Sequence, residues 1–301
     1  MPKAAEKTLI IILSETRAHE LTFPGFKANF LEPLGADLAL CVADNPREDQ
    51  NNPFYMSADY IWTYPEPDDW ADGFDWIADN EGWHGDWRQL LKIKDQWLGG
   101  IRDPIEGHPG SGGILLFFRY FLRKSLKESG ALEQYDRFII TRSDYMHTIP
   151  HLPINLLSRD KIWIPRGEDY GGVTDRQIIA NREDILSVLS IADDVFTKPD
   201  QLYERMHQHQ HWNIEQFIKS QFDFYGLSKR VRRYPATMFA VRARDGHTSW
   251  AKGIYDDKLG YFVKYPKEYR RYLLCSKFVS ERTGWNRLKI WIINTLNFVG
   301  F

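Results

Sequence analysis

The chain has 301 residues, 43% hydrophobic and 27% charged, which is enough for one large α/β domain or two modest ones. Its formal net charge of −2 argues against a protein that binds nucleic acid with its whole surface. No stretch reaches the ~18–20 continuous apolar residues of a membrane-spanning helix, and the apolar run Leu9–Leu13 is too short for an export signal, so we expect a cytoplasmic protein, soluble or peripheral on the inner face of the membrane.

Apolar runs and helical periodicity alternate along the first part of the chain. The pattern predicts a strand at 8–13, a helix at 23–34 and a strand at 37–42. Residues 66–86 then hold eight acidic residues and no Lys or Arg, interleaved with Trp and Phe. Such a segment is typical of a solvated loop or a short helix that its aromatic rings anchor.

The alternation continues to the last third of the chain. We expect a helix at 87–100, a Gly-rich loop at 107–113, a helix at 114–128, strands at 138–140 and 161–165, and helices at 175–196 and 213–226. Strands that alternate with helices predict an α/β protein with one mainly parallel sheet flanked by helices.

Three polar loops follow predicted strands. They are Ser14–Arg17, Arg142–Asp144 and the segment 166–176. Because the carboxyl ends of parallel strands meet at one edge of a sheet, we expect these loops to converge on one crevice. The order G-x-G-x-x-G and the P-loop are both absent from the sequence, so neither a classical dehydrogenase nor a kinase is supported.

The second and third loops resemble a known family. Arg142-x-Asp144 ends a strand, and "IPRGEDYGGVTDR" (164–176) follows further along the chain. With the opening "LIIILSETRAHE" (9–20), these runs resemble nucleotide-sugar-dependent glycosyltransferases of GT-A-like fold, found in bacterial surface-polysaccharide clusters and in large algal viruses. The resemblance covers roughly residues 8–220, and we expect a GT-A-like domain at 1–263.

The resemblance implies transfer of a sugar from a nucleotide-sugar donor to a glycan or lipid-linked acceptor. The donor-binding residues would be Ser14, Thr16, Arg17, Arg142, Gly171 and Gly172. The two glycines also permit positive φ and a close approach of the ligand to the backbone. Glu215 would lie on a helix that faces the cleft and bind the acceptor, although a solvent-facing Glu explains this residue equally well.

Metal binding depends on Asp144. Such enzymes often carry a D-x-D motif, but here Arg142 replaces the first Asp. Asp144 can hold Mg or Mn through one oxygen. Arg142 and Arg17 can share or replace the role of the metal ion in binding the diphosphate, because a guanidinium binds phosphate bidentately. A surface ion pair between Arg142 and Asp144 is the alternative. We expect Asp144→Ala to abolish transfer and to leave the fold intact, because a strand-end carboxylate is peripheral to a core.

A carboxylate in the third loop is the predicted catalytic base. We favour Asp175, with Asp169 and Glu168 as the other candidates, because a carboxylate at the crevice wall can accept the proton of an acceptor hydroxyl. Asp175 or Thr174 can instead cap the helix expected at 175–196.

Two other functions fit the same residues. A metal-dependent phosphohydrolase or nucleotidyltransferase would use Asp144, Asp169 and Asp175 to hold two metal ions. A non-catalytic carbohydrate-binding or scaffold protein would use the aromatic residues, which make up 15% of the chain.

The segment 264–301 is expected to be a basic, amphipathic tail. In its last part, from Trp285, apolar residues recur at spacings of three and four with Arg and Lys beside them. Such a helix fits an anionic membrane surface, and a helix docked on the domain's own core fits nearly as well.

Overall fold

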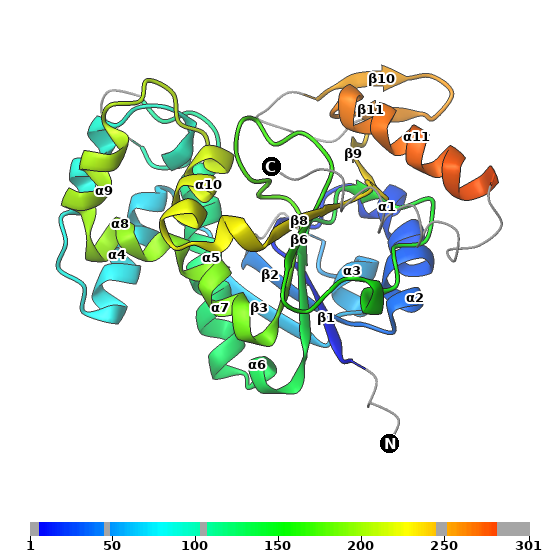
Figure 1. Ribbon diagram of the computed structural model, residues 1–301, viewed down its shortest axis with the longest axis horizontal. Helices are drawn as coiled ribbons and strands as arrows, with labels where there is room; N and C mark the ends of the chain where they lie inside the picture. The colour runs from blue at the N-terminus through cyan, green and yellow to red at the C-terminus, as the bar shows by residue number, and fades with distance from the viewer. Residues whose placement is uncertain (1–5, 45–48, 103–106, 245–251, 282–301) are drawn as a thin grey trace.

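The computed structural model describes residues 6–44, 49–102, 107–244 and 252–281. They form a seven-stranded central sheet with helices on both faces, and a four-stranded sheet beside it (Figure 1). The mainly parallel, helix-flanked α/β sheet that the sequence predicts is therefore confirmed, and the arrangement is consistent with a GT-A-like fold.

The central sheet has the strand order β3-β2-β1-β4-β7-β6-β8. The strands are β1 Thr8–Ile12, β2 Asp37–Asp44, β3 Tyr60–Pro65, β4 Arg137–Thr141, β6 Ile162–Pro165, β7 Ile178–Asn181 and β8 Val231–Tyr234. β7 runs antiparallel to both of its neighbours, while every other adjacent pair is parallel. Because β7 is antiparallel to both β4 and β6, β6 runs in the same direction as β4. The carboxyl ends of β1, β4 and β6 therefore lie at the same edge of the sheet.

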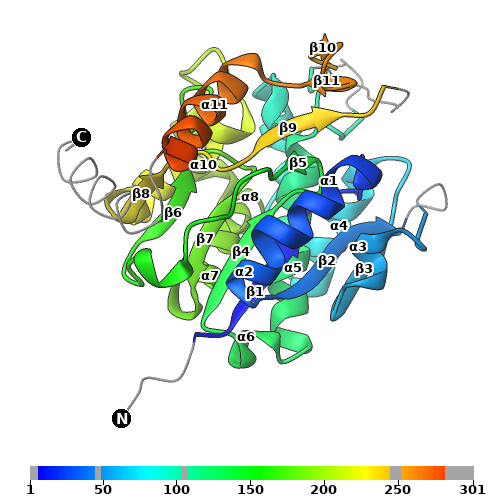
Figure 2. The ribbon, with the colours of Figure 1, turned by 90° about the vertical axis from the view of Figure 1, so that its right-hand side faces the viewer.

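Helices cover both faces of this sheet. One face carries α1 His19–Phe26, its π-helical continuation Lys27–Leu31, α2 Glu32–Leu34 and α3 Pro53–Met56. The other carries α4 Trp70–Glu81, α5 Gly112–Glu128, α7 Arg182–Leu189, α8 Asp193–Thr197, α9 Pro199–Met206 and α10 Ile214–Phe224, with α6 Ala131–Gln134 leading into β4. Figure 2 shows α1 and α2 lying across the strands.

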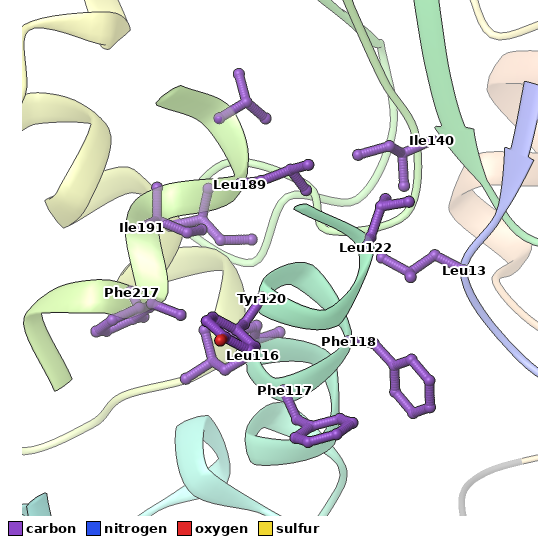
Figure 3. Close-up of a cluster of buried hydrophobic side chains, with 14 of the residues drawn as sticks. Leu13, Leu116, Phe117, Phe118, Tyr120, Leu122, Ile140, Leu189, Ile191 and Phe217 are labelled. Carbon is purple, nitrogen blue, oxygen red and sulfur yellow. The ribbon is translucent and has the colours of Figure 1, made fainter. Parts of the chain in front are cut away.

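Successive side chains of the central strands enter two separate cores. Ile11 of β1 lies in the core under α4, α5, α7 and α10, and Ile12 in the core under α1 and α3; both are fully buried. Figure 3 shows part of the first core, in which α5 lies between Ile140 of β4 and Phe217 of α10. Burial of both faces explains why the strands read as unbroken apolar runs.

The second sheet is antiparallel, in the order β10-β11-β9-β5. Its strands are β5 Tyr145–Met146, β9 Phe239–Arg242, β10 Ile254–Asp256 and β11 Tyr261–Val263, and α11 Pro266–Glu281 follows β11. The ring of Tyr272 on α11 lies 4.7 Å from that of Phe239 on β9. Because β5 begins directly after Asp144, this sheet is attached at the carboxyl end of β4.

Most predicted elements are confirmed. The strands expected at 8–13, 37–42, 138–140 and 161–165 are β1, β2, β4 and β6. The helices expected at 23–34, 114–128 and 213–226 are α1 with its continuation, α5 and α10. The acidic segment contains α4, which Asp69 caps and whose Trp70 and Phe74 are buried.

One predicted helix is wrong. The segment 175–196 does not form a single helix, because Ile178–Asn181 is the strand β7 and the helical part starts at Arg182. The side chain of Asn181 accepts the backbone N–H of Asp184, so this residue ends the strand and caps α7. Strand β7 runs straight into the periodic helix α7, so the hydrophobic pattern of the sequence shows no break between them.

The helix expected at 87–100 is also wrong. This segment forms two short 3₁₀ helices, Trp87–Lys92 and Gln96–Leu98. Between them Ile93 is extended and Asp95 has φ of 110°, a conformation that an α-helix excludes.

The expected tail divides into two parts. Residues 266–276 belong to α11 and pack on the second sheet, whereas 282–301, which hold the predicted amphipathic stripe, lie outside the described residues. The tail as a separate unit therefore stays a prediction. Searching the described ranges finds no helix with the length and apolar character needed to cross a membrane.

Candidate functional site

The three polar loops meet at one edge of the central sheet, as the sequence predicts. The first two are joined by a hydrogen bond of 2.6 Å that the hydroxyl of Ser143 donates to the backbone carbonyl of Glu15. The third loop is tied to β4 through Gln177, which accepts from the Thr141 hydroxyl at 3.1 Å and donates to that of Tyr234 at 2.7 Å. The loops thus form one connected structure.

Asp144 lies at the centre of this edge and is buried. Its Oδ1 accepts from Arg142 Nε at 3.1 Å and its Oδ2 from Arg142 Nη2 at 3.2 Å. Oδ2 also accepts from Nη1 of Arg242, the last residue of β9. The Asp144 side chain is 3% exposed, so the expectation that Asp144→Ala leaves the fold intact is wrong: this carboxylate is part of the interior.

Two further cations approach the same carboxylate. Lys264, directly after β11, is mostly buried and feels the charges of Asp144, Arg142 and Arg242. Arg17 of the first loop is 38% exposed and pairs with Glu15. Its guanidinium also lies within electrostatic reach of Arg142. Arg17, Arg142, Arg242 and Lys264 are called the cationic cluster below.

The pKa values follow from this crowding. Burial raises the pKa of Asp144, but the charges of Arg142, Arg242 and Lys264 outweigh it and hold that pKa well below its usual range. Burial, together with repulsion from Arg142, lowers the pKa of Lys264 to about 7. The lysine is thus destabilised in its charged form, because burial removes water from it and, secondly, more positive than negative charge surrounds it.

In the first loop, Thr16 and Ser14 make structural contacts, whereas Arg17 is partly exposed. Thr16 is buried, and its hydroxyl oxygen accepts a hydrogen bond of 2.8 Å from Asn52 Nδ2, so that side chain holds the loop against the body of the protein. The hydroxyl of Ser14 donates to the backbone carbonyl of Glu15 at 3.1 Å. Arg17 is the most exposed of the three arginine side chains in the cationic cluster.

Gly171 and Gly172 of the third loop are required for different structural reasons: Gly171 for its backbone conformation and Gly172 for close packing. Gly171 has φ of 82°, which side chains rarely adopt, and follows Tyr170 at φ of 46°. A Cβ on Gly172 would stand 1.9 Å from the backbone oxygen of Glu215. Gly172 is therefore required for the approach of α10, and its predicted contact with the donor stays a prediction.

Asp175 and Glu215 come together beside this loop and are called the acidic pair below. Burial, and next the charge of Asp175, raise the pKa of Glu215 to about 8. Asp175 is 3.8 Å from Arg176 Nε and also within electrostatic reach of Arg142. Strand β7, not a helix, follows Asp175, so helix capping does not explain this residue.

The other two candidate carboxylates make contacts of their own in the third loop, and the charge of Asp169 also reaches Glu215. Asp169 forms an ion pair of 2.6 Å with Arg233. Glu168 contributes its backbone carbonyl, which accepts from Arg176. These contacts give Asp169 and Glu168 roles in shaping the loop, so Asp175 is the better candidate for a base.

Several buried residues that support this site were not predicted. Arg119 of α5 is 1% exposed, and its Nη2 donates to the backbone carbonyl of Asp175 at 3.4 Å. Arg176 donates to Glu268 at 3.3 Å and lies 4.5 Å from the ring of Tyr265. These contacts hold the third loop between α5 and α11.

Arg242 and Lys264 are candidate site residues that the sequence did not single out. Each ends an apolar strand, in "MFAVR" and in "YFVK", and so repeats the pattern that singled out Arg142. That pattern was the available signal, but only the pairing of β9 with β5 and β11 brings the two cations to Asp144.

Comparison with solved structures finds a weak likeness. No family model and no curated protein matches the chain. Among solved structures, the apo form of mouse xyloside xylosyltransferase 1 is similar over 77% of this chain and 85% of its own, with a TM-score of 0.39 and 10% sequence identity. A likeness at this level gives no basis for transferring the activity of that enzyme.

Proposed function

We propose that the chain is a glycosyltransferase that moves a sugar from a nucleotide-sugar donor to a glycan or lipid-linked acceptor in surface polysaccharide synthesis. The main support is that the cationic cluster and the acidic pair lie at the same edge of the sheet, close enough for Arg142 to feel the charge of Asp175. Crevices at the carboxyl ends of parallel strands are where open α/β sheets bind ligands.

The chemistry needs both groups. An acceptor hydroxyl oxygen bonds to the anomeric carbon, the bond from that carbon to the diphosphate oxygen breaks, and the diphosphate leaves with the electron pair. Fixed positive charge stabilises the leaving group, and the cationic cluster supplies it. Asp175 accepts the hydroxyl proton. Glu215, with a pKa raised to about 8 by burial and by Asp175, keeps its proton at neutral pH and can donate a hydrogen bond to a sugar.

The residues at Asp144 do not fit the expected divalent cation. Mg and Mn are bound by carboxylates that present free oxygens, together with substrate phosphates. Both oxygens of Asp144 accept hydrogen bonds from arginine, and Lys264 adds a further positive charge. A metal ion here would displace an arginine and meet the remaining cations.

The phosphohydrolase or nucleotidyltransferase alternative has less support. A two-metal site needs clustered carboxylates, but Asp144 and Asp169 are each paired with arginine. Over the ranges that the structure describes, no three His, Cys, Asp or Glu side chains form a group that could hold a metal ion.

A thermal-shift panel tests the proposed function. We expect UDP, GDP or CDP to raise the Tm by several degrees, because a ligand at about 100 times its Kd stabilises the native state by about 2.7 kcal/mol. The matching nucleosides, which lack phosphate, serve as controls. No shift with any diphosphate, with Mn or with EDTA, would instead favour a non-catalytic carbohydrate-binding protein.

We also propose that the C-terminal segment brings the enzyme to an anionic membrane surface, where a lipid-linked acceptor would be met. Each Lys or Arg near such a surface contributes on the order of 1 kcal/mol. We expect the intact chain to co-sediment with vesicles that contain anionic lipid, and a chain ending at Ser280 to bind less. Equal sedimentation of the two chains would contradict this proposal.

A further inference from the structure

We infer that the leaving diphosphate is held without a metal ion, by Arg142 and Lys264 directly, while Asp144 and Arg242 act as positioning residues behind them. This inference rests on the proposed function and deepens it, because it assigns the binding of the diphosphate to residues of two different sheets. It also replaces the metal-ligand role of Asp144 with a different one.

The backbone fixes these residues relative to one another. Val241 N–H donates to the Asp144 carbonyl at 2.9 Å, and Lys264 N–H donates to the Ala240 carbonyl at 2.9 Å. β5, β9 and β11 therefore set the spacing between Asp144, Arg242 and Lys264 as neighbouring strands of one ladder. A site built on strands holds charges more rigidly than one built on loops alone.

Asp144 orients Arg142 through the two hydrogen bonds between their side chains. A lone carboxylate in this position would also repel a phosphate. Arg242 offsets that effect, because its guanidinium pairs with the same carboxylate. The guanidinium of Arg142 is thus held in one orientation and still presents positive charge to a ligand. The Arg142 side chain is 19% exposed, so a ligand can reach it.

Lys264 lacks a carboxylate partner of its own. Among the ion pairs of the described residues none involves Lys264, and its Nζ lies 4.9 Å from the centre of the Tyr265 ring. An anion beside Lys264 would supply the partner that this cation lacks.

A buried lysine in an anion-binding site is expected to have a lowered pKa when no anion is bound, and Lys264 has such a pKa. Burial and like charge bring this pKa to about 7, and a bound diphosphate would raise it. The groups that face Lys264 are Arg142 and Asp144 after β4, Arg242 on β9, Arg176 in the third loop, Tyr265, and the buried Glu268 of α11. Affinity for a diphosphate should therefore fall as pH rises above about 7, because the lysine then loses its proton.

Equilibrium binding to the intact protein tests the inference. The probes are UDP, GDP, CDP and inorganic pyrophosphate, each measured by calorimetry in EDTA and again with Mn. We expect the best probe to bind equally well in both conditions. Lys264→Gln should weaken binding in EDTA by about tenfold or more at pH 6.5, the loss of one charge-assisted hydrogen bond.

Lys267→Gln is the matched control. It makes the same change of charge at an exposed position three residues away on α11, and it should alter binding by less than about twofold because salt screens an exposed charge. Affinity should also fall less between pH 6.5 and pH 8 in Lys264→Gln than in Lys267→Gln. Because the probe titrates in the same way with both variants, comparing the two removes the pH dependence of the probe itself.

The outcomes separate the two levels of the proposal. Binding that requires Mn and is unaffected by Lys264→Gln would overturn the metal-independent site and leave the proposed function standing. Absence of binding by every probe in both conditions would overturn the proposed function and this inference together. Metal-independent binding that Lys264→Gln leaves unchanged would overturn the assignment of Lys264.

Discussion

Asp144→Ala is expected to lower the free energy of unfolding by about 3–5 kcal/mol, as removal of one partner of a buried ion pair does. The carboxylate is 3% exposed and holds Arg142 and Arg242 together. Alanine would leave the guanidinium groups of Arg142 and Arg242 without the carboxylate that they share, and the Arg242 side chain is 3% exposed. The loss would be measured by urea denaturation monitored by circular dichroism.

Asp223→Ala is the control for this experiment. Asp223 pairs with Lys219 one turn away on α10, and both side chains are about half exposed, at 47% and 50%. Exposed pairs of this type contribute about 0.3–0.5 kcal/mol. If Asp144→Ala were no more destabilising than Asp223→Ala, Asp144 would not be the structural centre of the site. Loss of activity in Asp144→Ala alone would not identify a metal ligand, because the fold around Arg142 changes too.

Asp175→Asn is expected to lower the rate of sugar transfer by about 10²–10⁴-fold, the usual contribution of a general base. Asparagine keeps the size of the side chain and cannot accept the proton. In the natural chain burial and the charge of Asp175 raise the pKa of Glu215 to about 8, so Glu215 is protonated at neutral pH. Asp175→Asn removes the contribution of that charge, but burial, the larger cause, still raises the pKa of Glu215 and disfavours it as a replacement base. The rate would be followed as nucleoside diphosphate released from the donor that the thermal-shift panel identifies.

Asp169→Asn is the matched control, because it makes the same change in the same loop at a residue paired with Arg233. We expect its transfer rate to stay within a few-fold of the natural chain, and we expect both variants to bind the diphosphate normally. A rate that falls in Asp169→Asn and not in Asp175→Asn would move the base to Asp169. Weaker diphosphate binding in Asp175→Asn would indicate a positioning role instead.

Local patterns in the sequence were sufficient for the central sheet. The run from Leu9 to Leu13 and the run Phe138–Ile140 are apolar at every position, and strands buried on both faces require that. The polar residues that follow them identified the edge where the candidate site lies, because parallel strands end together. Arg142, Asp144 and Asp175 could be named as candidates on this basis.

Other features depend on contacts between distant segments. Asp144 and Arg242 are 98 residues apart and meet only because β9 pairs with β5, and Lys264 joins them through β11. No periodicity in the sequence encodes which strands of an antiparallel sheet become neighbours. The burial of Asp144 follows from that pairing and turns a predicted surface carboxylate into the centre of an ion-pair network.

The same distinction explains the error at β7. The first three residues of β7, 178–180, are apolar as in a strand and as in a buried helical turn, and the sequence alone favoured joining them to the helix that follows. The hydrogen-bonding partners of β7 lie on β4 and β6, far away in sequence. The chain's local hydrophobic order thus specified which segments are buried and where the ligand edge lies, whereas pairing between remote strands determined the charges that meet there.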